Sequence, residues 1–437
     1  MYPNPQAALP LPSRPNVEQY KKLAKDLVKA CKAGSSAAIE AWATRWIQAL
    51  AAGQEEPRAF RGDADLAGHA AEIAGFARQK LARGETSPKC ALSDAQFVIA
   101  RAHGFLSWPR FRKHIESLAQ PDSAISGFET AATAVVRGDI RKLERLLRGN
   151  PDLIREVSTR EHRATLLHYV SANGVEGYRQ VSPKNAAHIA EFLLAAGAEV
   201  DATADVYGGG CTALGLVATS EPPRLAGVQQ DVMDVLLKHG ARMDNDGLAG
   251  NRHTLVYACL ANGQPAAAEY LANRGAPLDL ASASGVGRLD AVKEFFDSGG
   301  RLRAESQLAD AFAMACGYGH VAVVEFLLDR GFEINAPLNL HGEGHTGLHV
   351  AAFHGHFAVV NLLLNRGARV DVIAKTWPTP PLLWALTGWT LKKGEGQYYD
   401  MLARLVAAGS TIRPDVFDWQ QVKADPRMLT ALKARTV

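Results

Sequence analysis

A short phrase recurs along the C-terminal three quarters of this 437-residue chain, and its period decides what the chain can fold into. The phrase is an apolar pair followed within a few positions by glycine, at Gly197, Gly240, Gly275, Gly300, Gly331, Gly367 and Gly409. The spacings are 43, 35, 25, 31, 36 and 42 residues. An earlier copy ends at Asn150, which tolerates the same left-handed backbone at a helix end as glycine does. A repeat of about 35 residues indicates stacked supersecondary units that share one core.

A second phrase precedes the first by about one helix, most clearly at residues 165–174 and 345–356, with weaker copies beginning at Thr212, Thr254 and Phe312. Together the two phrases resemble the ankyrin repeat, a helix–turn–helix unit with a protruding β-turn finger. The resemblance covers roughly residues 126–413, in about eight units. It implies that Thr346 caps a first helix and that His349 bonds backbone across the turn. It also implies a packing stripe of Ala351, Ala352, Val359, Leu362 and Leu363.

The chain is therefore predicted to be an all-α, ankyrin-type α-solenoid with short β-turn fingers, preceded by a small helical domain. Residues 1–15, with five prolines, are expected to form an extended lead-in, and residues 16–120 an N-terminal helical domain. The repeats are placed at 124–413, and residues 414–437 are expected to form a closing helical cap. The opening segment resembles that of many bacterial ankyrin-repeat proteins, which implies a bacterial source and no known activity.

Composition excludes several other classes of protein. With 47% apolar and 21% charged residues the chain is not disordered as a whole, and no apolar run is long enough to span a membrane. The N-terminus lacks the pattern of a signal peptide. The five cysteines (Cys31, Cys90, Cys211, Cys259 and Cys316) are scattered singly with no close pair. That usage favours a reducing, cytoplasmic location and argues against a disulfide framework.

A role in nucleic-acid binding finds only weak support. Residues 13–120 carry 17 Lys and Arg against 11 Asp and Glu, a balance of +6 that an ordinary helical surface also explains. The helix–turn–helix pattern at 92–114 has Pro109 in its second helix and Arg110 at a position that should be buried. Both features argue against a DNA-reading motif.

Two irregular loops in adjacent units carry a pocket-like set of side chains. The insertion at 174–183 contains Glu176, Tyr178 and Arg179, and the fingertip at 204–211 contains Tyr207. Adjacent units place the two loops on one edge of the solenoid. They can brace each other, or they can form a small-molecule or catalytic site, and the sequence leaves both readings open.

The leading functional prediction is a non-enzymatic scaffold that binds a protein or peptide. The resemblance places partner contacts on the concave face, and the candidate contact residues are Asp205, Tyr207, Asn339, His341, Glu343, Trp377 and Trp389. The alternative is a small-molecule-binding protein or enzyme built around Tyr178 and Tyr207. The histidines near 341–356 have roles within the repeat, so no metal site is predicted, and no cofactor is expected. The sequence indicates no oligomeric state.

Overall fold

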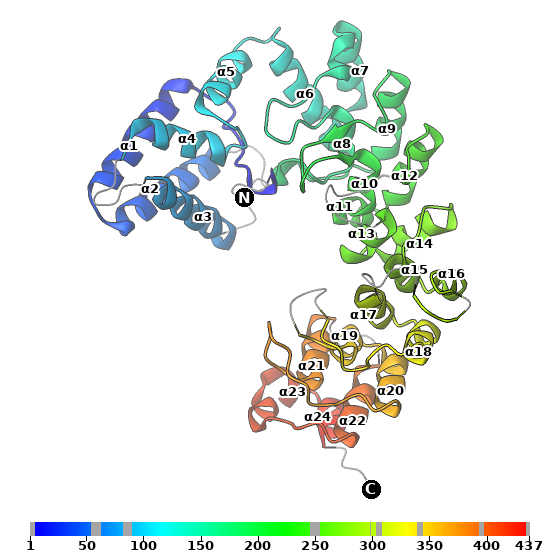
Figure 1. Cartoon of the computed structure of the whole chain (residues 1–437). Coiled ribbons are helices and arrows are strands. Elements are labelled where there is room, and N and C mark those ends of the chain that lie inside the picture. Colours follow the sequence, from blue (N-terminus) through cyan, green and yellow to red (C-terminus); the bar gives the residue numbers. More distant parts are fainter. Residues whose placement is uncertain are drawn as a thin grey trace. The chain divides into compact units, whose positions relative to one another are not determined.

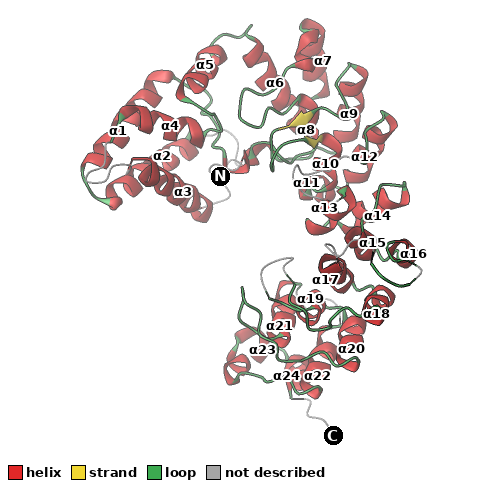
Figure 2. Ribbon diagram, viewed as in Figure 1, coloured by secondary structure: helices red, strands yellow, loops and turns green. Residues whose placement is uncertain are grey.

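The computed structural model describes residues 5–53, 63–81, 90–244, 254–297, 299–302, 308–338, 344–392 and 397–433. These residues form two compact units, Met1–Asn251 and Arg252–Val437. Figure 1 labels the elements of both, and Figure 2 shows that almost all of them are helices. Among the described residues, no helix is both long and apolar enough to cross a membrane.

The first unit begins with a helical domain that has its own core. It comprises a 3-10 turn η1 (Pro5–Ala7) followed by α1 (Val17–Lys32), α2 (Ser36–Ala52), α3 (Asp63–Leu81), α4 (Leu92–Ala102) and α5 (Trp108–Leu118). Its core includes Trp42, Trp46, Phe105 and Phe111, together with Leu9 from the lead-in. The Leu9 amide donates to Ala102 O at 2.8 Å, so the lead-in is attached to the end of α4.

A disulfide joins Cys31 at the end of α1 to Cys90 just before α4. The expectation that the cysteines do not pair is therefore wrong for these two. They lie 59 residues apart in the chain, and only the packing of α1 against α4 brings them together. Cys211, Cys259 and Cys316 are free and buried. The cytoplasmic location stays a prediction, and this disulfide argues against it, because disulfides persist mainly in oxidising compartments.

The rest of the first unit holds three helix pairs of the repeat. The pairs are α6 (Ala124–Arg137) with α7 (Ile140–Gly149), α8 (Leu166–Val170) with α9 (Ala186–Ala195), and α10 (Ala213–Ala218) with α12 (Gln229–Lys238). Between them lie η2 (Pro151–Arg155), η3 (Gly177–Arg179) and the extra helix α11 (Glu221–Leu225). A finger precedes α10, where β1 (Thr203–Ala204) pairs antiparallel with β2 (Cys211–Thr212).

The second unit holds five further pairs and a C-terminal segment. The pairs are α13 (Leu255–Ala261) with α14 (Pro265–Asn273), α15 (Leu280–Gly285) with α16 (Leu289–Glu294), α17 (Leu308–Tyr318) with α18 (Val321–Asp329), α19 (Gly347–His354) with α20 (Phe357–Asn365), and α21 (Pro381–Leu391) with α22 (Tyr398–Ala407). The chain then forms η5 (Pro414–Asp418), α23 (Gln420–Lys423) and α24 (Pro426–Leu432). Val416, Val422, Met428 and Leu432 are buried in the same core as the repeats.

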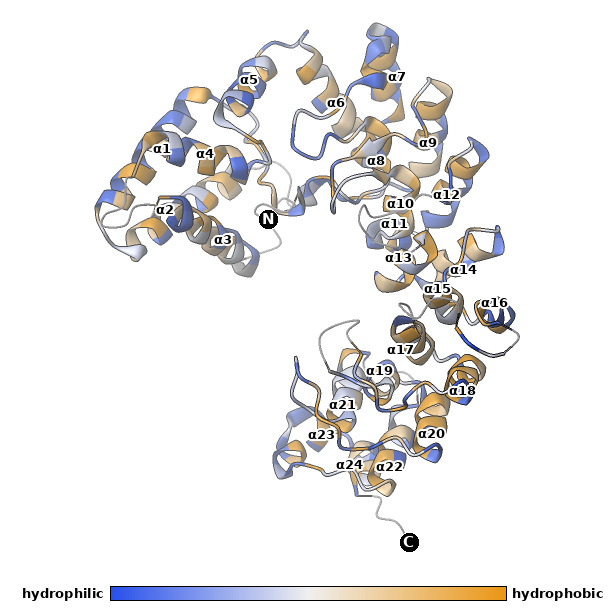
Figure 3. Cartoon of the chain, in the orientation of Figure 1, coloured by the Kyte–Doolittle hydropathy of each residue, from blue (hydrophilic) through white to orange (hydrophobic). Residues whose placement is uncertain are grey.

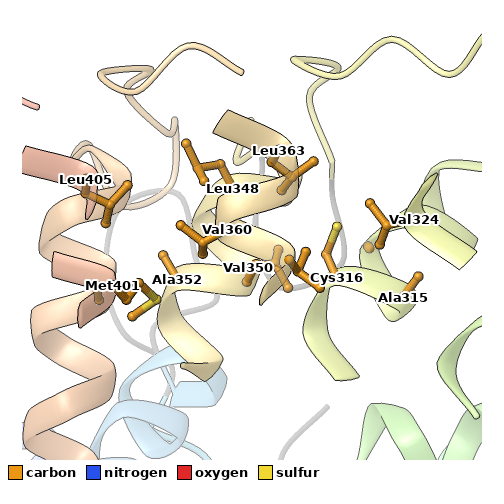
Figure 4. Packing of buried hydrophobic residues seen from close by; sticks show 14 of the residues in the cluster. Ala315, Cys316, Val324, Leu348, Val350, Ala352, Val360, Leu363, Met401 and Leu405 are labelled. Carbon is orange, nitrogen blue, oxygen red and sulfur yellow. The ribbon is translucent and has the colours of Figure 1, made fainter. Parts of the chain in front are cut away.

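The stacked helices of the second unit from α15 onward share one continuous apolar cluster. Figure 4 shows side chains of successive pairs in contact, from Ala315 and Cys316 on α17 through Val350 and Val360 to Met401 on α22. Hydrophobic and hydrophilic residues are interspersed along most of the helices (Figure 3). No single pair can bury its apolar side alone, so the units stabilise one another only as a stack.

The roles implied for Thr346 and His349 are confirmed. The Thr346 amide donates to His349 Nδ1 at 3.0 Å, while His349 Nε2 lies 3.2 Å from the carbonyl oxygen of Thr379 in the next unit. The stripe residues Ala351, Ala352, Val359 and Leu363 are fully buried, and Leu362 is partly buried. The same arrangement recurs at His168, which bonds Thr165 and the carbonyl of Cys211. These histidines connect units and are not free to act as ligands.

Candidate functional site

Three of the sequence-predicted candidates lie together in the first unit. Glu176, Tyr178 and Arg179 lie on the insertion that follows α8, where Glu176 immediately precedes η3. Gly177 between them packs so closely on the lead-in that a Cβ at this position would collide with the carbonyl oxygen of Gln6. The insertion is therefore shaped to receive the N-terminal segment.

Glu176 and Arg179 join Glu129 of α6 and Arg160, which lies between η2 and α8, in a buried ion cluster. Arg160 Nη1 lies 2.6 Å from Glu129 Oε1 and 2.8 Å from Glu176 Oε1. Arg179 Nη2 lies 2.8 Å from Glu129 Oε2, and its Nη1 lies 3.5 Å from Glu176 Oε1. Two guanidinium groups thus alternate with two carboxylates, and the four charges cancel. Buried charges require such pairing because desolvation of an isolated ion costs several kcal/mol.

The surroundings of the buried ion cluster hold its charges in place. Burial raises the pKa of Glu129, but the charges of Arg160 and Arg179 outweigh burial and lower it to about 2. The pKa of Glu176 is likewise lowered, since the same two guanidinium groups overcome the effect of burial. Burial raises the pKa of Tyr178 to about 12, and its hydroxyl accepts a hydrogen bond from Arg160 Nη2 at 3.3 Å. The carboxylates are ionised and the phenol is neutral at pH 7.

Polar contacts attach the N-terminal domain to the repeats around this cluster. Arg101 Nη1 of α4 lies 2.6 Å from Glu161 Oε2, and the Glu161 amide donates to the carbonyl oxygen of Gly104 at 2.9 Å. The side chain of Arg160 also lies over the Phe105 ring, at 5.5 Å from its centroid. The buried ion cluster is therefore part of the joint between the helical domain and the first repeats.

Tyr207 contributes to this joint from the neighbouring finger. Its hydroxyl donates to Asn173 Oδ1 at 2.7 Å and accepts from Gln6 Nε2 at 2.5 Å. The insertion and the fingertip do meet, and what they hold between them is the lead-in. Asp205, on the same finger, is exposed, and its Oδ2 lies 3.8 Å from Arg163 Nε.

A cavity of about 380 Å³, here called the α6 pocket, opens beside the buried ion cluster. Its lining includes Tyr178 and Arg179, but neither Glu176 nor Tyr207. The lining residues are Pro10, Leu11, Pro12, Ser13, Pro15, Leu118, Ser126, Glu129, Thr130, Thr133, Val136, Arg137, Lys142, Arg160, Tyr178 and Arg179. The four residues predicted to form one pocket therefore do not all line it. Tyr178 and Arg179 line the α6 pocket, whereas Tyr207 bonds Gln6 of the lead-in, the segment whose later residues form one wall of the pocket.

A larger hollow, about 830 Å³, lies between α1 and α2. Its lining includes four alanines, Trp42 and Trp46, and the Trp42 indole donates to the carbonyl oxygen of Leu23 at 3.2 Å. Its charged residues, Asp26, Lys29 and Arg45, do not form a buried set. The α6 pocket therefore has the more specific chemistry despite its smaller volume.

The other predicted contact residues differ in their exposure to solvent. Trp377 is 56% exposed, on the finger before α21, with its ring centroid 5.5 Å from that of Trp384. Trp389 is only 7% exposed and belongs to the apolar core, so its proposed role as an exposed anchor is wrong. The sequence places Trp389 in a helix, but it does not show whether the side chain points toward the core or toward solvent. Asn339, His341 and Glu343 lie outside the described residues.

Sequence reasoning missed Glu129 and Arg160, which complete the buried ion cluster. One signal was present, because Glu129 stands among the apolar residues Phe128, Ala131, Ala132 and Val135 of α6, where a carboxylate must have a cationic partner. In the part of the chain that the structure describes, no group of three or more His, Cys, Asp or Glu side chains could hold a metal ion.

The eight helix pairs in the described part of the chain, most of them with a side-chain cap on the first helix, define the class of protein, a helical repeat solenoid. Residues 278–374 match the family model "Ankyrin repeats (3 copies)". The chain therefore contains ankyrin repeats in this segment.

Two solved structures illustrate the likeness. The human ASB11 ankyrin repeat domain is 20% identical, and the match covers 61% of this chain and 97% of that one with a TM-score of 0.31. The ankyrin repeat domain of Bcl-3, described as a unique member of the IkappaB protein family, is 20% identical, with coverages of 61% and 98% and a TM-score of 0.30. Scores this low add no argument, so the assignment rests on the repeat residues and the family model. No curated protein matches the chain.

Proposed function

We propose that this chain is a non-enzymatic scaffold that binds a protein partner with the fingers and first helices of its second unit. Ankyrin repeats are generally protein-interaction modules, and this supports the class of function. The observation that carries the proposal is the finger between α20 and α21. Two large apolar side chains on it, Ile373 and Trp377, are 54% and 56% exposed. Large apolar and aromatic side chains that stay exposed are typical of interface anchors.

The ends of the stack suit this role. We propose that residues 16–120 cap the first repeats and residues 414–437 the last, as the sequence predicts. The apolar residues of η5, α23 and α24 cover the core beyond α22, and Arg160 of the buried ion cluster lies over the Phe105 ring of the helical domain. Capped ends keep a solenoid soluble and leave the fingers free for a partner.

The test is an affinity capture from cells of the source organism with the intact chain as bait. The parent and Trp377→Ala are compared with Leu391→Ala as the matched control. Leu391 is 67% exposed but lies at the end of α21 remote from the finger. A partner that uses the finger should bind the Trp377→Ala variant with a Kd raised about 30-fold, the effect of losing an anchor worth about 2 kcal/mol. Capture of nothing, or equal Kd values for the two variants, would contradict the proposal.

A further inference from the structure

We propose that the surface in contact with the lead-in is a binding site for extended, proline-containing peptide segments, and that the chain's own residues 5–15 occupy it as an intramolecular ligand. This surface, here called the lead-in site, consists of Ala102, His103, Gly104, Gly177, Tyr207 and the α6 pocket. A partner presents a segment of the same chemistry, with small and branched apolar residues before a proline, and displaces the lead-in. The inference does not depend on the protein-binding proposal, because the lead-in site lies in the first unit.

The lead-in has the conformation of a bound peptide. Residues 8–12 belong to no helix or strand. Pro10 and Pro12 fix their own φ, and each restricts the leucine before it to extended backbone. Ala8 and Leu9 are 4% and 1% exposed, so the apolar pair before Pro10 is the anchor. Extended proline-containing segments lose little conformational entropy on binding, and they recur as recognition motifs for this reason.

Two glycines of the lead-in site leave room for the segment. A Cβ at Gly177 would collide with the carbonyl oxygen of Gln6, and a Cβ at Gly104 would lie 3.3 Å from the Cβ of Ala8. Glycine is favoured where a second stretch of chain approaches the backbone this closely. Gly104 follows α4 of the helical domain, whereas Gly177 lies in the insertion after α8. Both sides of the joint are therefore shaped to the same segment.

Hydrogen bonds from both sides hold the lead-in. The Leu9 amide donates to the carbonyl oxygen of Ala102 at 2.8 Å, and the carbonyl oxygen of Leu9 lies 3.1 Å from His103 Nδ1. On the repeat side, Gln6 Nε2 donates to the hydroxyl of Tyr207 at 2.5 Å. The insertion and the fingertip, two irregular loops of adjacent repeats, thus meet around a peptide. Loops of this kind shape the binding surface of a solenoid.

The lead-in does not fill the space beside it. Pro10, Leu11, Pro12, Ser13 and Pro15 line the α6 pocket, which keeps a volume of about 380 Å³. Side chains that border a void lose the dispersion contacts that they would make in a filled site. A segment with larger side chains at these positions gains those contacts. An external partner can therefore compete with the resident segment.

The experiment titrates a synthetic peptide of residues 5–15, labelled with fluorescein at its C-terminus, with the full chain and follows fluorescence anisotropy. The variant Leu9→Asp releases the resident lead-in, because its anchor would bury an unpaired charge. Ser13→Asp is the matched control, since it adds the same charge at an exposed position of the lead-in. Circular dichroism checks that the helices remain, and Leu9→Ala takes the place of Leu9→Asp if they do not.

The Leu9→Asp chain should bind the peptide saturably, at about one molecule per chain. The parent and Ser13→Asp should bind it at least about tenfold more weakly, because the attached lead-in competes at an effective concentration in the mM range. Adding Gly177→Ala to the Leu9→Asp chain should raise the Kd about tenfold or more. The matched change Gly149→Ala, with open space around its Cβ, should alter the Kd less than about twofold.

Three results would overturn the proposal. The first is a folded chain with its anchor removed that does not bind the peptide saturably. The second is a parent chain that binds the peptide as tightly as the Leu9→Asp chain does, since the peptide would then lie elsewhere. The third is an equal effect of Gly177→Ala and Gly149→Ala on the Kd.

Discussion

Replacing Glu176 by Gln removes one charge from the buried ion cluster and tests whether the cluster holds the first unit together. Glu176 is completely buried, with Arg160 Nη1 at 2.8 Å, Arg179 Nη1 at 3.5 Å and His162 Nε2 at 3.7 Å from Oε1. The substitution leaves two guanidinium groups facing the single carboxylate of Glu129. Breaking a buried ion pair from one side typically costs about 3–5 kcal/mol, because the remaining charge stays desolvated.

The compensating variant distinguishes charge from shape. Arg160→Met combined with Glu176→Gln removes one charge of each sign and leaves Arg179 facing Glu129 at 2.8 Å. We expect this double variant to be more stable than Glu176→Gln alone, by more than about 1 kcal/mol. Such a reversal has no explanation in lost packing, since the double variant loses more native groups.

The assay is native-state hydrogen exchange followed by mass spectrometry, with urea added in steps. Peptides from α6 and α8 report the opening free energy of the first unit separately from that of the second. The surface control is Glu191→Gln, whose side chain pairs with Lys238 and His239 on an exposed face and whose loss should change nothing measurable. The reasoning is refuted if Glu176→Gln behaves like this control, or if the double variant is less stable than the single one.

Three further outcomes are expected. Reduction of the Cys31–Cys90 disulfide, or substitution of both cysteines by Ser, should destabilise the N-terminal domain by up to about 4 kcal/mol, because the unfolded chain regains the entropy of a 59-residue loop. Urea unfolding monitored at peptides of α1 and α2 measures this loss of stability. A change of Gly388 to Ala should unfold or strongly destabilise the second unit, because the new Cβ would collide with the carbonyl oxygen of Phe353. The control Gly367→Ala has open space around the new Cβ and should show only the smaller strain of its left-handed backbone. Thermal melts of the two variants measure the difference. Acid should lower the free energy of unfolding in two steps, which urea midpoints measured against pH would show: burial lowers the pKa of His168 and His349 to about 4, so their contribution is full above about pH 6.5 and is lost toward pH 4. The pKa of Glu129, lowered to about 2, adds a further loss below about pH 4.5. A midpoint that does not change between pH 7 and pH 4 would contradict the first step.

The sequence by itself determined the repeat architecture. Period, glycine position and helix caps are local properties, since each depends on residues within one turn or one helix of each other. Thr346 and His349 lie three positions apart, so their hydrogen bond follows from the helix start alone. The apolar stripe on α19 and α20 follows from helical spacing in the same way.

Only the tertiary structure decided which distant residues share a site. Glu129, Arg160 and Glu176 come from three separate segments, and no local pattern relates them until the repeats stack against the helical domain. Cys31 and Cys90 pair for the same reason, and Trp389 is buried because its side of α21 faces a neighbouring helix. Local periodicity specifies the elements, whereas desolvation and packing between elements specify the α6 pocket and the buried ion cluster beside it.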